Sequence, residues 1–458
     1  MSAAPKRLIA SAFVLFQQFV DDDLGCASYL IGDEDAGLAA IVDPPYAVER
    51  VLESAERHGV EIVRTVETHT HADHVSGHGR LALDHGVPVS IHPAAEVAYP
   101  SDPLTDGAEL ELGQVVLRAI HTPGHRPEHT CLTVIDRSRA EEPWLVLTGD
   151  SLFVGDAARP DLAVGAKEGA EDLFHSLRRL LELPDGVELF PGHVAGSLCG
   201  KGMSSKASST IGFERRFNHA LQLRDELEFV TESAGASAPK PPNMARILDL
   251  NRGPLLGAPT EVAELTGTPA GVTVLDVRDA ADFVAGHAHG ALNVPVAGGS
   301  FATRAGFVLD LAERIVVQAE SAAEAARAIR GLRSVGFLEL DGYLLGAGPE
   351  RIEPVGLDEL DRLLEQGAEL IDVRERDERD GGYIAGSRNI PYRLLPSCVE
   401  EVATDKPVVT ICESGARAGI AASILAANGV AARPVLEGGI AEWAARGGQT
   451  VEFRRCGS

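Results

Sequence analysis

The chain has 458 residues, 45% of them hydrophobic, and a formal net charge of −27 at pH 7. A chain of this length is too long for one hydrophobic core, so we expect two to four domains of a soluble protein. The negative charge argues against nucleic acid and anionic membrane surfaces as partners, because both would repel it.

The six cysteines are scattered, with no short repeated spacing. This usage favours reduced thiols in a cytoplasmic protein over a disulfide framework. The apolar run Leu8 to Phe16 follows two basic residues, as in a signal peptide, but no cleavage site of small residues comes after it. We therefore predict that this run is the first strand of the N-terminal domain, and we expect no membrane span.

In the first half of the chain, short apolar runs surround a helix-like segment. Val48 to His58 predicts a helix that ends at Gly59, a usual C-cap. The strand-like runs are Ser28 to Ile31, Ala39 to Val42, Val60 to Val66, Pro88 to Ile91, Val115 to Ile120 and Leu145 to Leu147. Several of them lead directly into polar motifs, so we expect an α/β sandwich whose strand ends deliver side chains to a common edge.

The most distinctive segment is Thr68 to His74, which holds three histidines and an aspartate. Imidazole and carboxylate groups are standard metal ligands, and their close spacing lets one turn aim several at one point. Similar residues follow other apolar runs, which makes the candidate ligands His69, His71, Asp73, His74, His125, Asp150 and His193. Histidines without this context are predicted at the surface or at helix caps: His58, His78, His85, His92, His121 and His175.

Four motifs in order resemble the metallo-β-lactamase superfamily: Thr68 to His74, Pro123 to His125, Gly149-Asp150 and Pro191 to His193. The resemblance implies an αββα sandwich with metal in a cleft at one sheet edge. Two branches of the superfamily keep all seven candidate ligands. Glyoxalase II-like thioesterases use them for two metals and a bridging hydroxide, whereas persulfide dioxygenases hold one ferrous iron on two histidines and one aspartate.

Downstream segments resemble the persulfide dioxygenases that are fused to rhodanese domains. These segments are Ser151 to Leu162, Gly196 to Lys201 and Ser209 to Asn218. The resemblance implies one Fe(II) per chain, a triad with open positions for persulfide sulfur and dioxygen, and these ligands: His69, His125 and Asp150. The remaining candidates would orient the ligands and supply hydrogen bonds; they are His71, Asp73, His74 and His193.

Two further residues are candidates for substrate binding. Arg159 either contacts an anionic thiol carrier such as glutathione or coenzyme A, or forms a salt bridge with Asp156 or Asp161. Cys199 either enters the cleft as a thiol that takes up sulfur or is a small buried residue, as free cysteine usually is.

Beyond a linker at Glu232 to Pro242, the sequence contains an internal repeat. Val274 to Arg278 recurs as Leu370 to Arg374, and Gly286 to Pro295 recurs as Gly382 to Pro391. A second linker begins at residue 346 and separates two copies that are each long enough for a small α/β domain. We therefore predict three domains, at residues 1–242, 243–348 and 349–458.

The repeat resembles rhodanese domains, and its last copy carries a cysteine in the active loop. Cys412 follows the predicted strand Val408 to Ile411 and precedes a helix over Ala418 to Asn428, whose N-terminus favours thiolate and persulfide forms. Arg417 adds a cation for an anionic sulfur compound. Four residues separate Cys412 from Arg417, against five in the dual-specificity phosphatases of this fold, so sulfur transfer is favoured over phosphate chemistry.

The middle copy has no cysteine, because none occurs between Cys199 and Cys398. It cannot carry sulfane sulfur on a thiol, and we predict a structural or docking role, such as a spacer or a dimer surface.

The leading hypothesis is a bifunctional enzyme of sulfide detoxification. Iron and dioxygen would oxidise a low-molecular-weight persulfide to sulfite and thiol, and Cys412 would move sulfane sulfur between persulfide, sulfite and thiosulfate. One alternative is a glyoxalase II-like dinuclear thioester hydrolase with a sulfurtransferase domain. Another is a sulfur carrier or docking protein whose first domain is a relic, against which the intact ligand set argues. The carrier thiol, the direction of sulfur transfer and the oligomeric state, including a homo-oligomer, stay open.

Overall fold

The computed structural model describes residues 14–161, 165–194, 203–234, 239–402 and 405–452. Its contacts divide the chain into two compact units. The first comprises Met1–Pro259 with Ser334–Gly336, and the second comprises Thr260–Arg333 with Phe337–Ser458. No helix within the described ranges combines the length and the apolar character that crossing a membrane requires.

The first unit contains two six-stranded sheets. One has the order β1-β2-β3-β4-β5-β6 and consists of β1 (Val14–Val20), β2 (Ala27–Asp33), β3 (Leu38–Val42), β4 (Glu61–Val66), β5 (Val89–Ile91) and β6 (Asp102–Pro103). The other has the order β12-β11-β10-β9-β8-β7 and consists of β7 (Glu109–Leu112), β8 (Val115–His121), β9 (Thr130–Asp136), β10 (Leu145–Gly149), β11 (Glu188–Pro191) and β12 (Ser209–Thr210).

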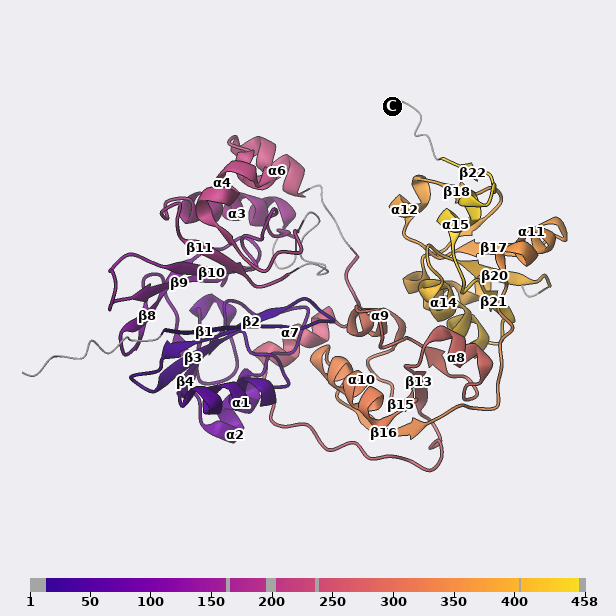
Figure 1. Cartoon of the computed structure of the whole chain (residues 1–458), viewed down its shortest axis with the longest axis horizontal. Coiled ribbons are helices and arrows are strands. Elements are labelled where there is room, and N and C mark those ends of the chain that lie inside the picture. The colour runs from indigo at the N-terminus through magenta and orange to yellow at the C-terminus, as the bar shows by residue number, and fades with distance from the viewer. Residues whose placement is uncertain (1–13, 162–164, 195–202, 235–238, 403–404, 453–458) are drawn as a thin grey trace, which may run out of the picture. The chain divides into compact units, whose positions relative to one another are not determined.

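Helices cover the outer faces of these sheets, as Figure 1 shows. The first sheet is covered by α1 (Glu49–His58) and α2 (His78–His85), and the second by α3 (Ala166–Leu180), α4 (Ile211–Phe217) and α6 (Glu226–Ala234). This unit also includes the 3₁₀ helix η1 (Pro93–Ala95), α5 (His219–Gln222) and α7 (Met244–Arg252). Buried residues of both sheets, such as Ile31, Val42, Leu117 and Leu147, pack together between them. The expected αββα sandwich is therefore confirmed.

The predicted elements of this unit match the observed ones closely. The helix α1 ends at His58, and Gly59 follows with a φ of 65°, as a left-handed C-cap requires. Each predicted strand overlaps an observed one, although the run Leu8 to Phe16 lies mostly outside the described residues. The first strand instead runs from Val14 to Val20, because alternate residues Leu15 and Phe19 bury against the core beside α1.

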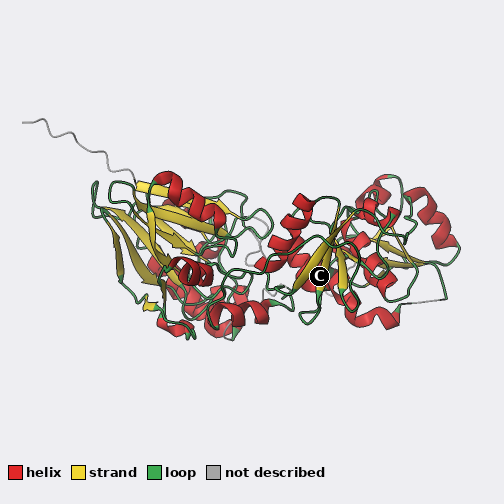
Figure 2. Cartoon of the chain, turned by 90° about the horizontal axis from the view of Figure 1, so that it is seen from below, coloured by secondary structure: helices red, strands yellow, loops and turns green. Residues whose placement is uncertain are grey.

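The second unit contains two four-stranded parallel sheets of matching topology. The middle copy has the order β14-β13-β15-β16 and consists of β13 (Thr273–Asp276), α8 (Ala280–Ala285), β14 (Leu292–Asn293), α9 (Phe301–Val308), β15 (Ile315–Ala319), α10 (Ala322–Ser334) and β16 (Leu340–Leu345). In this part of the chain the short strands lie among helices (Figure 2).

The last copy has the order β19-β17-β20-β21 and adds a small antiparallel pair of strands, β18 with β22. Its elements are α11 (Leu357–Glu365), β17 (Glu369–Asp372), α12 (Arg376–Asp380), β18 (Tyr383–Ile384), β19 (Arg388–Asn389), η2 (Tyr392–Leu394), α13 (Leu395–Cys398), η3 (Val399–Glu401), β20 (Val408–Ile411), α14 (Ala416–Ala427), β21 (Ala432–Pro434), α15 (Ile440–Ala445) and β22 (Thr450–Val451). The shared strand order supports a domain duplication.

A buried arginine makes the same hydrogen bonds in both copies. Arg278 donates to the carboxylate of Asp276 and to the carbonyl oxygen of Gly286. The last copy repeats this pattern with equivalent residues, namely Arg374, Asp372 and Gly382. Because the Asp and Arg of the repeated motif bind each other in both copies, we assign this pair to the fold.

An asparagine also repeats. Asn293 donates from Nδ2 to the carbonyl oxygens of Asp276 and Arg278, both at 3.0 Å. Asn389 makes the two equivalent bonds in the last copy, both at 2.9 Å. Asn293 is fully buried, whereas Asn389 is partly exposed.

We expect the substitution Asn293→Ala to lower the free energy of unfolding of its domain by about 1–3 kcal/mol. The buried carbonyl of Arg278 loses its donor, and that of Asp276 keeps only the N–H of Val294. The matched substitution Asn389→Ala should cost only about 0.5–1.5 kcal/mol, since water can reach the freed groups. Hydrogen-exchange mass spectrometry on peptides that contain β13 and β17 measures both effects in the whole chain. Equal losses would contradict the role of burial.

Candidate metal centre and cysteine site

The polar motifs of the first unit all follow strand ends at one edge of the sandwich. Thr68 to His74 follows β4, Asp150 follows β10, and His193 comes two residues after β11. Gly149 allows the turn before Asp150, because its φ is +46° and a Cβ there would lie 2.6 Å from the ring of His129. The expectation that strand ends deliver these side chains to a common edge is confirmed.

Three side chains converge at this edge: His69, His125 and Asp150. One ligand atom from each lies within 4.8 Å of the other two. Asp150 Oδ2 is 3.5 Å from His125 Nε2 and 4.0 Å from His69 Nε2. All three residues are buried, and Asp150 Oδ2 has no hydrogen-bond partner. An unpaired carboxylate oxygen beside two ring nitrogens is a donor set that a metal cation would complete.

Hydrogen bonds orient both imidazole rings. Thr68 Oγ1 donates to Asp43 Oδ2 at 2.8 Å, so it accepts from His69 Nδ1 at 2.9 Å. His125 Nδ1 lies 3.3 Å from the carbonyl oxygen of Arg159, which can only accept. Both rings therefore carry hydrogen on Nδ1 and turn the Nε2 lone pair toward Asp150.

Electrostatics keep these two rings neutral. Burial lowers the pKa of His69 well below its usual range, and the neighbouring charges of His71 and His125 act in the same direction. Burial also lowers the pKa of His125, although Asp150 opposes the shift. Neutral imidazole is the form that binds a metal.

The other predicted metal-site histidines face carboxylates. His193 lies between two of them, with Nδ1 2.7 Å from Asp150 Oδ1 and Nε2 2.6 Å from Asp73 Oδ2. His71 Nε2 lies 3.1 Å from Asp43 Oδ1 and 3.3 Å from a carboxylate oxygen of Glu67. Both ring nitrogens of His193 are therefore used in these contacts, whereas Nδ1 of His71 has no hydrogen-bond partner and is still available to a metal.

These contacts shift the pKa values of the carboxyl groups. Burial alone would raise the pKa of Asp150, but the charge of His193 and its hydrogen bond hold it well below its usual range. Burial would likewise raise the pKa of Glu67, yet hydrogen bonds from His71 and His78 lower it to about 2. The carboxylates are therefore ionised at neutral pH.

Two further groups among the described residues have ligand atoms within 4.8 Å of one another. The first consists of Cys26, Asp73 and His74, and the second of Asp43, Glu67 and His71. Cys26 Sγ lies 3.2 Å from Asp73 Oδ2 and 3.3 Å from His193 Nε2, and His74 Nε2 has no hydrogen-bond partner. Cys26 thus belongs to the site, and a second metal position next to the first triad is geometrically available.

Sequence reasoning missed several residues of this centre. His129 Nε2 accepts from the backbone N–H of Asp150 at 2.9 Å, and burial lowers its pKa to about 3. His78 was predicted at the surface or at a cap, which is wrong: it is 3% exposed, and its Nδ1 lies 3.3 Å from Glu67. Arg126 is fully buried and donates to Glu128. The only available signal was the density of polar residues between Pro123 and Thr130.

Of the two residues predicted to bind substrate, the structure describes Arg159 but not Cys199. Arg159 Nε and Nη2 donate to the two carboxylate oxygens of Asp161, at 2.7 and 2.8 Å, which is the ion pair that we considered for it. Its backbone carbonyl orients His125. Cys199 and the segment Gly196 to Lys201 lie outside the described residues.

Cys412 occupies the strand-to-helix turn of the last domain. It follows β20 and lies four residues before α14, and its Sγ accepts the backbone N–H of Gly415 at 3.1 Å. Gly415 has a φ of +91°, and a Cβ there would collide with the carbonyl group of Leu436. The glycine therefore permits the backbone to curl around the sulfur at the positive end of α14.

Arg417 is not free beside the thiol. Its guanidinium donates to both carboxylate oxygens of Glu378, at 2.6 and 2.7 Å, and this pairing raises its pKa. Arg374, which also binds Asp372, makes a single hydrogen bond from Nη1 to a carboxylate oxygen of Glu413, at 3.1 Å. Arg417 lies close enough to interact electrostatically with Cys412. The negative charge of Glu378 partly offsets the effect of the Arg417 charge on the sulfur.

The equivalent loop of the middle copy has different chemistry. Ala319 stands where the repeat alignment places Cys412, and Glu324 stands where it places Arg417. The Glu324 carboxylate accepts the backbone N–H of Glu320 at 2.6 Å. The carboxylate of Glu324 therefore binds the backbone of its own loop, and the loop offers no thiol.

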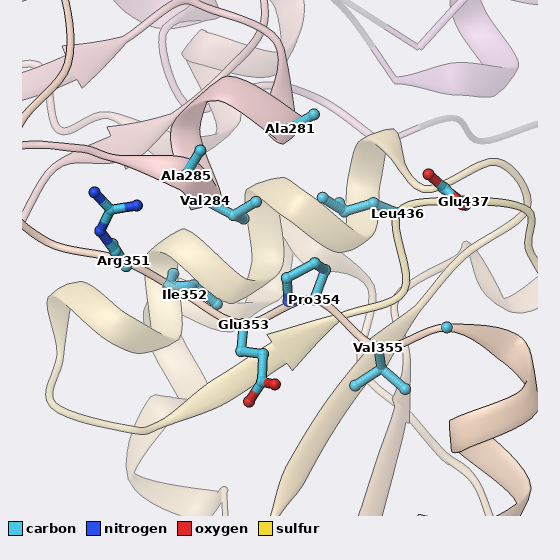
Figure 3. A pocket seen from close by; sticks show the side chains of 11 residues that line it. Ala281, Val284, Ala285, Arg351, Ile352, Glu353, Pro354, Val355, Leu436 and Glu437 are labelled. Carbon is cyan, nitrogen blue, oxygen red and sulfur yellow. The ribbon is translucent and has the colours of Figure 1, made fainter.

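A pocket of about 640 Å³ in the second unit lies between α8 and the turn at Leu436 (Figure 3). Its lining is mainly apolar and includes Val284, Ile352 and Pro354. Cys412 is not among the lining residues, so the thiol does not line this pocket.

Comparisons with known proteins agree with this division. The model of the metallo-beta-lactamase superfamily matches residues 21–193, and that of the rhodanese-like domain matches residues 356–446. The mitochondrial persulfide dioxygenase ETHE1 of Bos taurus is 30% identical over 240 residues, which cover 51% of this chain and 85% of that protein. The Homo sapiens protein of the same description is 28% identical with the same coverage.

The chain belongs to the metallo-beta-lactamase superfamily. It joins a domain homologous to ETHE1 persulfide dioxygenases to a C-terminal rhodanese-like domain. The crystal structure of a metallo-beta-lactamase from Staphylococcus aureus subsp. aureus COL is 28% identical, with a TM-score of 0.67, and covers 73% of this chain and 99% of that one. Because residues 1–259 are little more than half of the chain, that similarity extends beyond the first unit.

We expect the substitution Thr68→Val to weaken the binding of a divalent metal by this superfamily member about 10–100-fold, because His69 loses the hydrogen bond that fixes its Nδ1–H form. Competition with a chelator during Co(II) titration measures the affinity. Thr70→Val is the matched control, since Thr70 is equally buried in the same loop and its hydroxyl has no partner. Equal losses in both variants would contradict the role of Thr68.

Proposed function

We propose that this protein is a ferrous persulfide dioxygenase with a linked sulfurtransferase domain. The observation that carries the proposal is the convergence of His69 Nε2, His125 Nε2 and the unpaired Asp150 Oδ2. Homology to ETHE1 persulfide dioxygenases over half of the chain supports it. The net reaction would be RSSH + O₂ + H₂O → RSH + SO₃²⁻ + 2H⁺, in which sulfane sulfur loses the four electrons that dioxygen gains.

Ferrous iron, when bound to His69, His125 and Asp150, would supply electrons to dioxygen and open positions for both reactants. Two neutral rings and one carboxylate leave a net positive charge on such a centre, which suits an anionic persulfide. The residues around it keep the triad in its binding form. His129 and His193 hold the backbone and one carboxylate oxygen of Asp150, and Thr68 holds the ring of His69.

The arrangement favours one metal over two. A dinuclear thioester hydrolase would need His71 at the first metal and His193 at the second. Both ring nitrogens of His193 instead contact carboxylates, whereas Nδ1 of His71 stays available. The grouping of Cys26, Asp73 and His74 is the observation that keeps the dinuclear alternative open. Metal content separates the two functions.

In the last domain, Cys412 would carry sulfane sulfur between small anions. Attack of the thiolate on a persulfide gives Cys412–SSH and a free thiolate. Attack of sulfite on that persulfide sulfur then gives thiosulfate and regenerates the Cys412 thiolate. The backbone N–H of Gly415 and the N-terminus of α14 would stabilise the negative sulfur in both steps.

The proposal also includes a cytoplasmic location and a persulfide of glutathione, coenzyme A or a similar thiol as substrate. Four cysteines of the described residues are free thiols, which suits a reducing compartment. A homo-oligomer is part of the proposal, and light scattering of the purified protein tests it.

We expect the purified protein to contain one iron per chain and to consume one O₂ for each persulfide that it oxidises. Elemental analysis measures the iron, and an oxygen electrode with glutathione and coenzyme A persulfides measures the turnover. Two metals per chain together with thioester hydrolysis would establish the hydrolase instead. Full iron loading without oxygen uptake on any persulfide would contradict the dioxygenase proposal.

We expect Cys412→Ser to abolish thiosulfate formation and thiosulfate use, because serine cannot form a persulfide, while oxygen uptake stays within about twofold of wild type. Sulfite and thiosulfate assays on the same sample measure the two activities. Cys398→Ser is the control, because Cys398 lies outside the loop and is a free thiol. Loss of both activities in Cys412→Ser would contradict separate sites.

A further inference from the structure

The helix α7 lies outside both segments that the family models match, 21–193 and 356–446. The sequence-based boundary places the end of the first domain at residue 242, before this helix. The structure nevertheless includes α7 in the first unit. Near the end of this helix stands Asn251, which is 3% exposed. No polar role was predicted for it from the sequence.

Asn251 makes three hydrogen bonds, all to the backbone of the metal-site loop. Its Nδ2 donates to the carbonyl oxygens of His71 at 2.9 Å and His74 at 2.8 Å. Its Oδ1 accepts the backbone N–H of Ser76 at 2.9 Å. Two carbonyls on one side and one N–H on the other leave a single way to orient the amide, so both N–H groups are used.

These bonds hold an irregular loop that has only one isolated β-bridge, between Ser76 and Pro45, in this stretch. The loop runs from the end of β4 to the start of α2, and it contains His69, His71, Asp73 and His74. Carbonyls of buried irregular backbone need donors, and here a single side chain from a distant helix supplies two of them. The spacing between His71 and Ser76 is therefore set by the fixed geometry of one amide group.

The segment that carries Asn251 is itself anchored on the first unit. The backbone N–H of Ala98 donates to the carbonyl of Arg252 at 2.7 Å, and the Tyr46 hydroxyl donates to the carbonyl of Gly257 at 3.0 Å. Gly79, at the start of α2, lies so close to Leu256 that a Cβ would be 2.5 Å from its carbonyl oxygen. Asn251 thus reaches the loop from a fixed support.

We propose that Asn251 is a positioning residue of the metal centre: it clamps the His71–Ser76 loop and thereby sets the affinity of the His69, His125 and Asp150 triad for its metal. The inference rests on the proposed function only in requiring that a metal binds there. It makes α7, the helix that leads into the middle copy, a component of the centre.

The test uses the full chain with Co²⁺ alone as the probe. We expect Asn251→Ala to weaken Co²⁺ binding about 10–100-fold, as the loss of outer contacts around metal ligands typically does, and to change the visible spectrum of the bound Co²⁺. Asn251→Asp keeps the shape and the acceptor for Ser76 but loses both donors, so it should weaken binding to a similar extent. This second variant serves if the alanine variant does not fold.

Asn243→Ala is the matched control. Asn243 is also 3% exposed and directly precedes α7, but its Nδ2 donates to the carbonyl of Val335 and not to the loop. It should lower thermal stability about as much as Asn251→Ala while leaving Co²⁺ affinity and spectrum unchanged. Wild-type affinity and spectrum in both Asn251 variants would overturn the inference, as would equal weakening in Asn243→Ala.

The outcome is separable from that of the proposed function. A wild-type chain that binds Co²⁺ tightly but consumes no oxygen with iron and persulfide would refute the dioxygenase proposal and leave the role of Asn251 standing. A wild-type chain that binds no Co²⁺ at the triad would overturn both.

Discussion

Asp150 divides its two carboxylate oxygens between different tasks, and the metal centre depends on that division. Oδ1 accepts a hydrogen bond from His193, whereas Oδ2 has no hydrogen-bond partner and faces the Nε2 atoms of His69 and His125. A buried carboxylate oxygen without a partner destabilises the fold unless a cation completes it. The surrounding hydrogen bonds therefore preserve an open position, which is a functional requirement and not one of stability.

The sequence predicted the parts of this centre that follow strand ends. Thr68 to His74, His125, Asp150 and His193 each sit in a short turn after an apolar run, so chain order alone brought them to one edge. The residues that orient them could not be found in this way. Cys26, His129 and Asn251 act through hydrogen bonds to loops that are brought near by the fold, and a single polar residue in a strand or helix carries no local sign of such a partner.

The two copies of the second unit separate what the fold needs from what the chemistry needs. Both keep the arginine, the aspartate and the asparagine that join their strand ends, with the same hydrogen bonds. They differ at the loop, where Ala319 and Glu324 replace Cys412 and Arg417. The repeat was visible in the sequence because its most regular residues are structural. The recurring motif therefore identified the domain, and only the loop bears on the proposed sulfur transfer.

The charges around Cys412 extend this point. Sequence reasoning assigned Arg417 to an incoming anion. Its guanidinium donates to both carboxylate oxygens of Glu378, and Arg374 donates to Glu413. Arg374 and Arg417 are thus each paired with a carboxylate, whose negative charge cancels most of the electric field of the arginine at a distance. What remains close to the sulfur is the N–H of Gly415 and the N-terminus of α14, whose influence falls off within one helical turn. Such a site stabilises charge on the sulfur itself more than it attracts anions from solution, which would suit the proposed transfer of one sulfur atom among small anions.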